Sequence, residues 1–156
     1  MNLFYDAVFG IDHLPIPSKR LWVKVDEASG TATVGMRQSA KVFEATIRYY
    51  FDVIKRVSKW PTPDPVFLAI EATLPPTEFG QKDVDNVSKS VLDALKGLIY
   101  EDDRQVVSLF VSKASGADHS LVVGVKRLVP GEKIWFVPPL REAGYPLPSS
   151  PVLPVP

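Results

Sequence analysis

The spacing of apolar residues predicts two helices in this chain. Over residues 39–58, the apolar side chains of one helical face lie within about 80° of one another at 100° per residue. They are Phe43, Ile47, Tyr50, Ile54 and Val57. Ser39 can cap the start of this helix, and Pro61 forbids its continuation. A second stripe of valine and leucine predicts a helix over residues 84–98, with Gly97 near its end.

Runs of β-branched and aromatic residues predict six strands. They span residues 3–9, 21–25, 31–34, 66–73, 105–112 and 119–126. Turn-forming residues predict that the second and third strands form a hairpin, and that the last two strands form another. The run at 66–73 is the predicted central strand, because it is rich in β-forming residues. The expected fold class is α+β, with a mixed, largely antiparallel sheet and two principal helices.

The chain divides into a folded part and a proline-rich end. With 156 residues, of which 46% are hydrophobic, it is expected to form one domain. The last nineteen residues contain seven prolines, and such a segment can neither pair in a sheet nor form a helix. We expect a domain at residues 1–137 and an extended C-terminal tail at residues 138–156.

The composition excludes several classes of site. Without cysteine, the chain has no disulfide framework, no thiolate zinc site and no cysteine nucleophile. No apolar run approaches the roughly eighteen residues of a membrane span, and nothing near the N-terminus resembles a signal peptide. A glycine-rich phosphate loop is also absent, so no nucleotide cofactor is expected. We expect a cytoplasmic protein with no membrane partner.

Acidic residues are concentrated in one stretch of a chain whose formal net charge is zero. Residues 83–103 contain six acids and two lysines, a local net charge of −4, so the remainder carries +4. Such an acidic site in an otherwise basic chain fits a metal-dependent enzyme that acts on polyanions, because a divalent cation reverses the sign of the site. The alternative is ordinary variation of charge along a chain.

Asp83 and Asp85 stand at the start of the second predicted helix. Aspartate is favoured at a helix N-cap and in the first turn, which could account for one of the two. Two acids that are separated by a single residue on extended backbone point to the same side, as a hard cation requires of its ligands. Oxygen ligands alone select Mg²⁺ or Mn²⁺ rather than zinc. His13 and His119 have no ligand spacing and no constellation for general-base chemistry.

Three further residues near this pair are candidates for a role in metal or phosphate binding. Asp102 and Asp103 follow the helix, where a turn between helix and strand is the alternative explanation. Lys89 could pair with Asp85 at a spacing worth about 0.3 kcal/mol if exposed. It could instead bind a phosphate beside metal-bound carboxylates.

Together these residues resemble the signature of the RusA family of crossover junction endodeoxyribonucleases. The motif reads Asp83-Val84-Asp85-Asn86-x-x-Lys89, then Asp93-Ala94-Leu95, Gly97 and Asp102-Asp103-x-Gln105. The similarity extends more loosely over residues 5–127. It implies a homodimeric, Mg²⁺-dependent nuclease, with Mn²⁺ as a substitute, that resolves four-way (Holliday) DNA junctions by paired symmetric nicks.

The resemblance also implies a role for each matched position. Asp83, Asp85 and Asp103 would be catalytic metal-binding acids, with Asp102 as a supporting metal ligand. Lys89 would be the essential catalytic lysine. The candidate DNA-binding residues are Lys19, Arg20, Lys41, Arg48 and Lys113. For the basic side of the first helix, the alternative to a phosphate-backbone track is a solvated face.

Helix geometry leaves three ways to bring the acids together. A straight helix from Asp85 to residue 98 is about 20 Å long, so Asp103 leaves from its far end. Residues 99–103 could fold straight back along the helix, which is the favoured expectation. Alternatively, the helix could be shorter and start after the first two acids, or acids from different subunits could meet across a dimer. Two rival functions stay open: a non-catalytic module that binds branched DNA, and a nuclease of broader flap or fork specificity.

Overall fold

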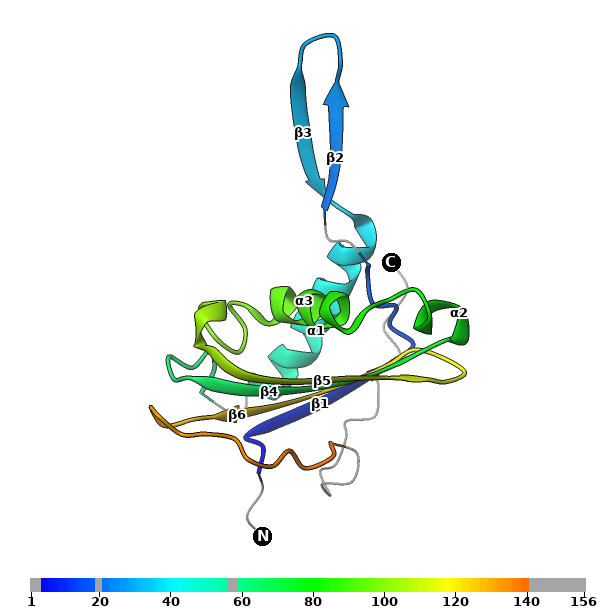
Figure 1. Cartoon of the computed structure of the whole chain (residues 1–156). Helices are drawn as coiled ribbons and strands as arrows, with labels where there is room; N and C mark the ends of the chain where they lie inside the picture. Colours follow the sequence, from blue (N-terminus) through cyan, green and yellow to red (C-terminus); the bar gives the residue numbers. More distant parts are fainter. Residues whose placement is uncertain (1–3, 19–20, 56–58, 141–156) are drawn as a thin grey trace.

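The structure is a computed structural model that describes residues 4–18, 21–55 and 59–140. A four-stranded sheet with two helices on one face forms its body (Figure 1). The strands are β1 (Ala7–Asp12), β4 (Val66–Leu74), β5 (Val106–Ser115) and β6 (Ser120–Arg127), in the order β1-β6-β4-β5. Only β4 and β5 are parallel; β6 is antiparallel to both β1 and β4. The predicted α+β class, the mostly antiparallel sheet and the central position of β4 are confirmed.

The predicted hairpin between the last two strands is wrong. β5 and β6 follow one another in the chain, but they lie on opposite sides of β4. Leu68 of β4, for example, lies opposite Leu109 of β5 and Val125 of β6. The turn between β5 and β6 therefore passes over the end of the central strand, and Gly116 N donates a hydrogen bond to Leu74 O there.

Two principal helices are present, as predicted, and both lie on one face of the sheet (Figure 1). α1 spans Gln38–Lys55 and α3 spans Val84–Leu95. α3 ends earlier than expected, because the backbone at Lys96 is extended and Gly97 has a φ of +78°, which glycine adopts at helix ends. Val84 was predicted to be in the buried stripe, but 42% of its surface is exposed.

The connection between β4 and β5 carries most of the acidic motif. It consists of α2 (Pro76–Phe79), α3 and a short 3₁₀ helix, η1 (Asp103–Gln105). Because parallel strands require a crossover, the chain must return from the end of β4 to the start of β5. α3 makes this return over one face of the sheet (Figure 1). Lys82, just before α3, accepts a hydrogen bond from Lys113 towards the end of β5, and η1, after α3, leads into the start of β5.

The main core lies between the sheet and the helices. Its largest fully buried side chains include Tyr100, Phe9, Phe43, Phe51 and Ile70. Tyr100 also donates a hydrogen bond from its hydroxyl to Leu92 O at 2.8 Å, which ties the turn after α3 to the helix. Burial raises the pKa of this phenol, so it stays a neutral donor.

The opposite face of the sheet is covered by the chain that follows β6 (Figure 1). Tyr5, Phe67 and Leu140 form part of a second buried cluster there. Tyr5 donates a hydrogen bond to Pro138 O at 2.7 Å, and Leu140 N donates one to Glu71 Oε1 at 3.0 Å. The packed part of the chain thus extends past the expected boundary at residue 137. The rest of the predicted tail, residues 141–156, lies outside the described residues.

A two-stranded hairpin projects away from this body (Figure 1). It consists of β2 (Leu21–Asp26) and β3 (Thr31–Met36), as predicted, and the two strands pair only with each other. Gly35 lies opposite Trp22, and a side chain at that position would collide with the indole ring. Val23, Val25 and Val34 are each more than half exposed, so the arm contributes little to the core.

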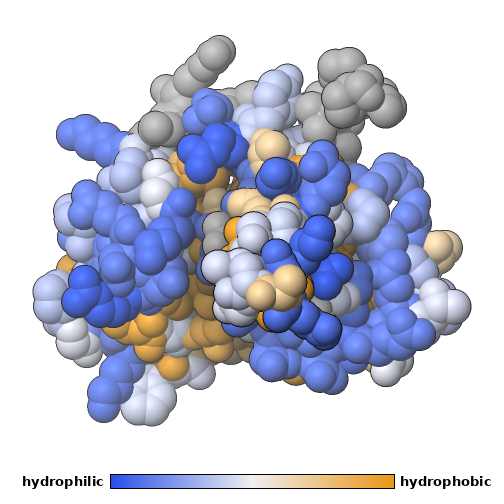
Figure 2. Space-filling view, turned by 90° about the horizontal axis from the view of Figure 1, so that it is seen from above, coloured by the Kyte–Doolittle hydropathy of each residue, from blue (hydrophilic) through white to orange (hydrophobic). Residues whose placement is uncertain are grey.

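The view from above the helices shows a largely hydrophilic surface with hydrophobic residues between the polar groups (Figure 2). Among the described residues, none of the helices combines the length and the apolar character that a membrane span requires.

Replacing Leu140 with alanine tests whether the second cluster belongs to the folded domain. Leu140 is 1% exposed, so Leu140→Ala should lower the free energy of unfolding by about 2–4 kcal/mol, measured by urea denaturation. Val129, which is 68% exposed, is the matched control, and Val129→Ala should change stability by less than about 0.5 kcal/mol. Equal stability of the two variants would contradict this packing.

Candidate active site

Asp83 and Asp85 lie at the exposed N-terminus of α3. Asp83 occupies the N-cap position with extended backbone, φ −78° and ψ 156°, but its side chain makes no capping hydrogen bond. Asp85 is in the first turn of the helix. The helix dipole stabilises negative charge here. The capping explanation of Asp83 therefore holds for its backbone and not for its carboxylate, which the first turn of the helix does not use.

Two lysines fix the turn that leads to this acidic pair. Lys113 of β5 donates hydrogen bonds from Nζ to Phe79 O and Lys82 O, each at 2.7 Å. Its ammonium also lies 4.5 Å from the centroid of the Phe79 ring. Lys82 Nζ in turn donates to Ile16 O and, at 2.6 Å, to Glu78 Oε2. The segment before Asp83 is thus tied to β5 and to the loop that follows β1, at residues 13–18.

A network of histidines and carboxylates adjoins the same turn. His119 Nε2 lies 3.0 Å from Glu78 Oε2, and His119 Nδ1 lies 3.5 Å from Asp118 Oδ1. His13 Nδ1 contacts the other oxygen of Asp118. The hydrogen bond from Lys82 is the main reason that the pKa of Glu78 lies below its usual value. No sequence pattern indicates that the two histidines share one carboxylate, since 105 residues separate His13 from Asp118.

Asp102 and Asp103 lie in the turn between α3 and β5. Asp102 caps η1: its Oδ1 accepts hydrogen bonds from Arg104 N at 3.0 Å and from Arg104 Nε at 2.9 Å. The backbone bond from Arg104, followed by the side-chain bond, lowers the pKa of Asp102. Gln105 Oε1 completes a capping box by accepting from Asp102 N. The alternative explanation of Asp102, as a residue that stabilises the turn between helix and strand, therefore accounts for its local contacts.

The four acids form two separate pairs within the chain. Asp102 Oδ2 and Asp103 Oδ2 each lie 3.9 Å from Lys96 Nζ, at the C-terminal end of α3. The twelve residues of α3 span about 18 Å, with Asp83 at the other end. Over residues 4–18, 21–55 and 59–140 there is no group of three or more His, Cys, Asp or Glu that could hold a metal ion. The favoured expectation, a chain that folds straight back along the helix, is wrong.

The helix is not short enough to support the second geometric alternative either, because it begins at Val84 and includes Asp85. Of the three alternatives, the meeting of acids from different subunits is the one that this geometry leaves. The Asp83–Asp85 pair could still hold a cation by itself, because Mg²⁺ is commonly bound through one or two carboxylates, with water and substrate phosphate as its other ligands.

Lys89 lies exposed in the middle of α3. It is one turn after Asp85, but the two side chains form no salt bridge. The ion pair between Lys89 and Asp85, which could have explained Lys89 without a role in catalysis, is therefore not formed. Its ammonium remains a candidate for contact with a bound phosphate.

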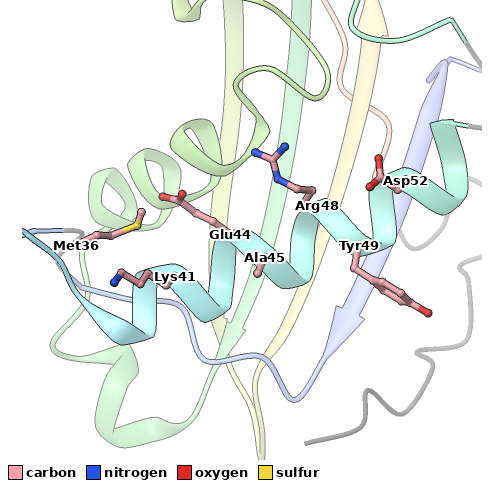
Figure 3. A pocket seen from close by; sticks show the side chains of 7 residues that line it. All are labelled: Met36, Lys41, Glu44, Ala45, Arg48, Tyr49 and Asp52. Atoms are coloured by element: carbon pink, nitrogen blue, oxygen red, sulfur yellow. The ribbon is translucent and has the colours of Figure 1, made fainter. Parts of the chain in front are cut away.

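The basic side of α1 carries two of the predicted DNA-binding residues. Lys41 and Arg48 are exposed, and both line a shallow surface pocket together with Glu44 and Asp52 (Figure 3). The two acids interrupt the positive charge along the helix, so this side is mixed rather than uniformly basic. Lys113 is engaged with backbone carbonyls, as described above. The other two candidates, Lys19 and Arg20, lie outside the described residues.

Comparison with known protein families gives a match to endodeoxyribonuclease RusA over residues 15–126. The matched range contains Asp83, Asp85, Lys89, Asp102 and Asp103. A search of curated proteins found no match. Because the family match covers more than half of the 156 residues, the chain belongs to the RusA family of endodeoxyribonucleases, which act on Holliday junctions.

Proposed function

We propose that this protein resolves four-way DNA junctions by paired, symmetric nicks in a reaction that depends on Mg²⁺, for which Mn²⁺ can substitute. The observation that carries the proposal is the exposed pair Asp83 and Asp85, with a cap-position carboxylate that makes no capping hydrogen bond. An unneutralised pair of acids would repel DNA. A divalent cation between the pair and a phosphate would reverse that repulsion.

The donor set fits a hard cation. Asp83 and Asp85 offer only carboxylate oxygens, which select Mg²⁺ or Mn²⁺ over zinc. A cation held there would lower the pKa of a bound water and offset the charge that develops on the phosphate. The carboxylates would bind and orient this group, with Asp103 and Asp102 as further oxygen ligands brought by a second subunit.

Lys89 would act on the substrate. Its ammonium, exposed and not paired with Asp85, would lie beside the phosphate that the acids hold and stabilise negative charge on the non-bridging oxygens. A lysine placed beforehand by the helix needs little rearrangement when that charge develops. This role differs from metal binding, so its loss should reduce turnover without removing the affinity for the cation.

A two-fold dimer would match the symmetry of the substrate. A four-way junction has approximate two-fold symmetry, and a C₂ dimer presents two identical sites to opposing strands. Lys41 and Arg48, exposed on α1, would contact the phosphate backbone of the arms. Contacts of this kind supply affinity that does not depend on sequence, while the acids perform the cleavage.

Removing the acidic charges should separate cleavage from binding. Asp83→Asn, Asp85→Asn and Asp103→Asn should each reduce the rate of junction nicking by more than about a hundredfold, comparable to losing a major electrostatic catalytic group. Binding of the junction, measured by gel shift with Ca²⁺ or chelator present, should be retained or strengthened. Glu27→Gln, in the exposed hairpin turn, is the control and should cleave normally. Loss of binding in all three variants would contradict the metal role.

Lys89→Ala should reduce kcat by about tenfold to a hundredfold, as expected for a lost charge contact in the transition state, while the thermal midpoint changes little. Lys89→Arg keeps the positive charge and should recover part of the activity. The checks are single-turnover nicking of a labelled junction and thermal denaturation. An unchanged kcat for Lys89→Ala would remove this residue from the mechanism.

Lys113→Met distinguishes a structural lysine from one that binds DNA. Its ammonium makes two hydrogen bonds to carbonyls, so its loss should lower stability by about 2–3 kcal/mol, measured by urea denaturation. Lys41→Met, at an exposed position, should leave stability unchanged and weaken junction binding. If Lys113→Met weakens binding at full stability, Lys113 contacts DNA directly.

A further inference from the structure

The carboxylate of Glu78 joins two nitrogen donors beside the segment that leads into the first acidic pair. Glu78 belongs to α2, at the end of the sheet where the chain turns from β5 to β6 (Figure 1). Its Oε2 atom lies 2.6 Å from Lys82 Nζ and 3.0 Å from His119 Nε2. Since Lys82 holds the pKa of Glu78 below its usual value, this carboxyl is ionised and can only accept. His119 Nε2 is therefore a donor to Glu78.

This contact is largely enclosed by the protein. The side chains of Lys82 and His119 are 11% and 12% exposed, and that of Glu78 is 31% exposed. Charged hydrogen bonds are strong in such surroundings, but a charge that loses its partner there is penalised. Without Glu78, the ammonium of Lys82 would keep the carbonyl oxygen of Ile16 as its described acceptor. The Lys82 side chain would then turn towards water, which would change the path of the backbone beside it.

The contact lies directly before the candidate metal ligands. Lys82 N donates a hydrogen bond to Glu78 O at 2.9 Å, so the backbone between them forms one compact turn. The next residue is Asp83, whose carbonyl oxygen accepts from Val87 N at 3.2 Å in the first turn of α3. Because no residue separates Lys82 from Asp83, a shift of Lys82 would displace the start of the helix.

His119 anchors this turn to the central sheet. It immediately precedes β6, which pairs with both β1 and β4. Its carbonyl oxygen accepts from His13 N at 2.9 Å, and its own backbone N donates to Asp118 Oδ1 at 2.7 Å. The imidazole is thus fixed by the sheet, whereas Glu78 belongs to the crossover between β4 and β5. Their contact joins the crossover to the sheet close to the acidic pair.

We propose that Glu78 and His119 are positioning residues for the nuclease reaction, and that their contact holds the crossover so that Asp83 and Asp85 can share one cation. Neither residue would touch the cation or the DNA. The inference rests on the proposed function for the identity of that ligand. It extends the site to two residues outside the acidic motif, one in α2 and one at the start of β6.

A second ion pair of the chain provides a matched control for this role. Lys126 Nζ lies 3.6 Å from Glu132 Oε1, and the Glu132 side chain is 32% exposed, almost the same as Glu78. The ammonium of Lys126 also lies over the ring of Phe4, which packs against the second cluster. This pair therefore lies on the face of the sheet that the helices leave uncovered. Its loss removes a similar contact without touching the crossover.

The first experiment needs neither metal nor DNA. Hydrogen exchange is measured by mass spectrometry on Glu78→Met, which removes the acceptor, and on the control Glu132→Met. Glu78→Met should accelerate exchange of residues 80–87 by about tenfold, comparable to the loss of one charged hydrogen bond, while β4 keeps its rate. Glu132→Met should leave residues 80–87 unchanged. Equal exchange of residues 80–87 in the two variants would overturn the proposal.

The second experiment measures the affinity for Mn²⁺ by electron paramagnetic resonance. The Kd should rise about tenfold in Glu78→Met and in His119→Leu, at the low end of the loss expected when a residue that orients a metal ligand is removed. The double variant should also lose about tenfold, because both substitutions break the same contact. His119→Gln keeps a nitrogen donor at similar reach and should recover most of the affinity, which a merely structural role would not require.

Junction nicking then separates this inference from the proposed function. At saturating Mn²⁺, Glu78→Met and His119→Leu should approach the rate of the unchanged protein, since their acids are intact, while Asp83→Asn stays inactive. Circular dichroism checks that each variant is folded, and His119→Leu tests the contact if Glu78→Met does not fold.

Each remaining outcome decides a different point. If both variants bind Mn²⁺ as tightly as the unchanged protein, the positioning role is overturned and the nuclease function stands. If their losses multiply in the double variant, the two residues act separately and the shared contact is overturned. If Asp83→Asn cleaves at the normal rate, the proposed function fails, and hydrogen exchange still judges whether Glu78 holds the crossover.

Discussion

The parallel pairing of β4 and β5 is the constraint from which the rest of the structure follows. Two parallel neighbours cannot be joined by a tight turn, so the chain must travel back along the sheet before β5 begins. Helix α3 forms most of this crossover connection, and it packs on the sheet through Val87, Val91 and Leu95. The acidic motif sits on this return path. Its first pair therefore lies at one end of the sheet and its second pair at the other.

This separation changes how the motif should be understood. In the sequence, the acids appear as one dense group within twenty-one residues. In the fold, Asp83 is held by the contacts of Lys82 and Lys113, whereas Asp102 is held by Arg104 and Gln105. Each pair has its own local scaffold, and neither scaffold depends on the other. A chain built in this way fixes each half of the motif separately.

Much of the fold could be predicted because its signals are local. The helical period identified α1, and the turn residues identified the projecting hairpin. The partner of each strand could not be predicted, since a turn at residues 113–118 looks the same whether or not the flanking strands pair. The contact of His13 and His119 with Asp118 depends on tertiary packing, as does the burial of Leu140. The acids of the candidate site were identified from their spacing, but their separation followed from topology.

The projecting hairpin has a consequence for the dynamics of the molecule. Among the described strands, β2 and β3 pair only with one another, and two-stranded hairpins without further packing are marginally stable in water. Backbone amides that bond across this arm can exchange with deuterium through a local opening, whereas those of β4, which lies between two neighbours, exchange only when the sheet separates. One short chain thus contains a sheet of two strands, whose amides need only a local opening to exchange, and a sheet of four strands, whose central amides need a larger one.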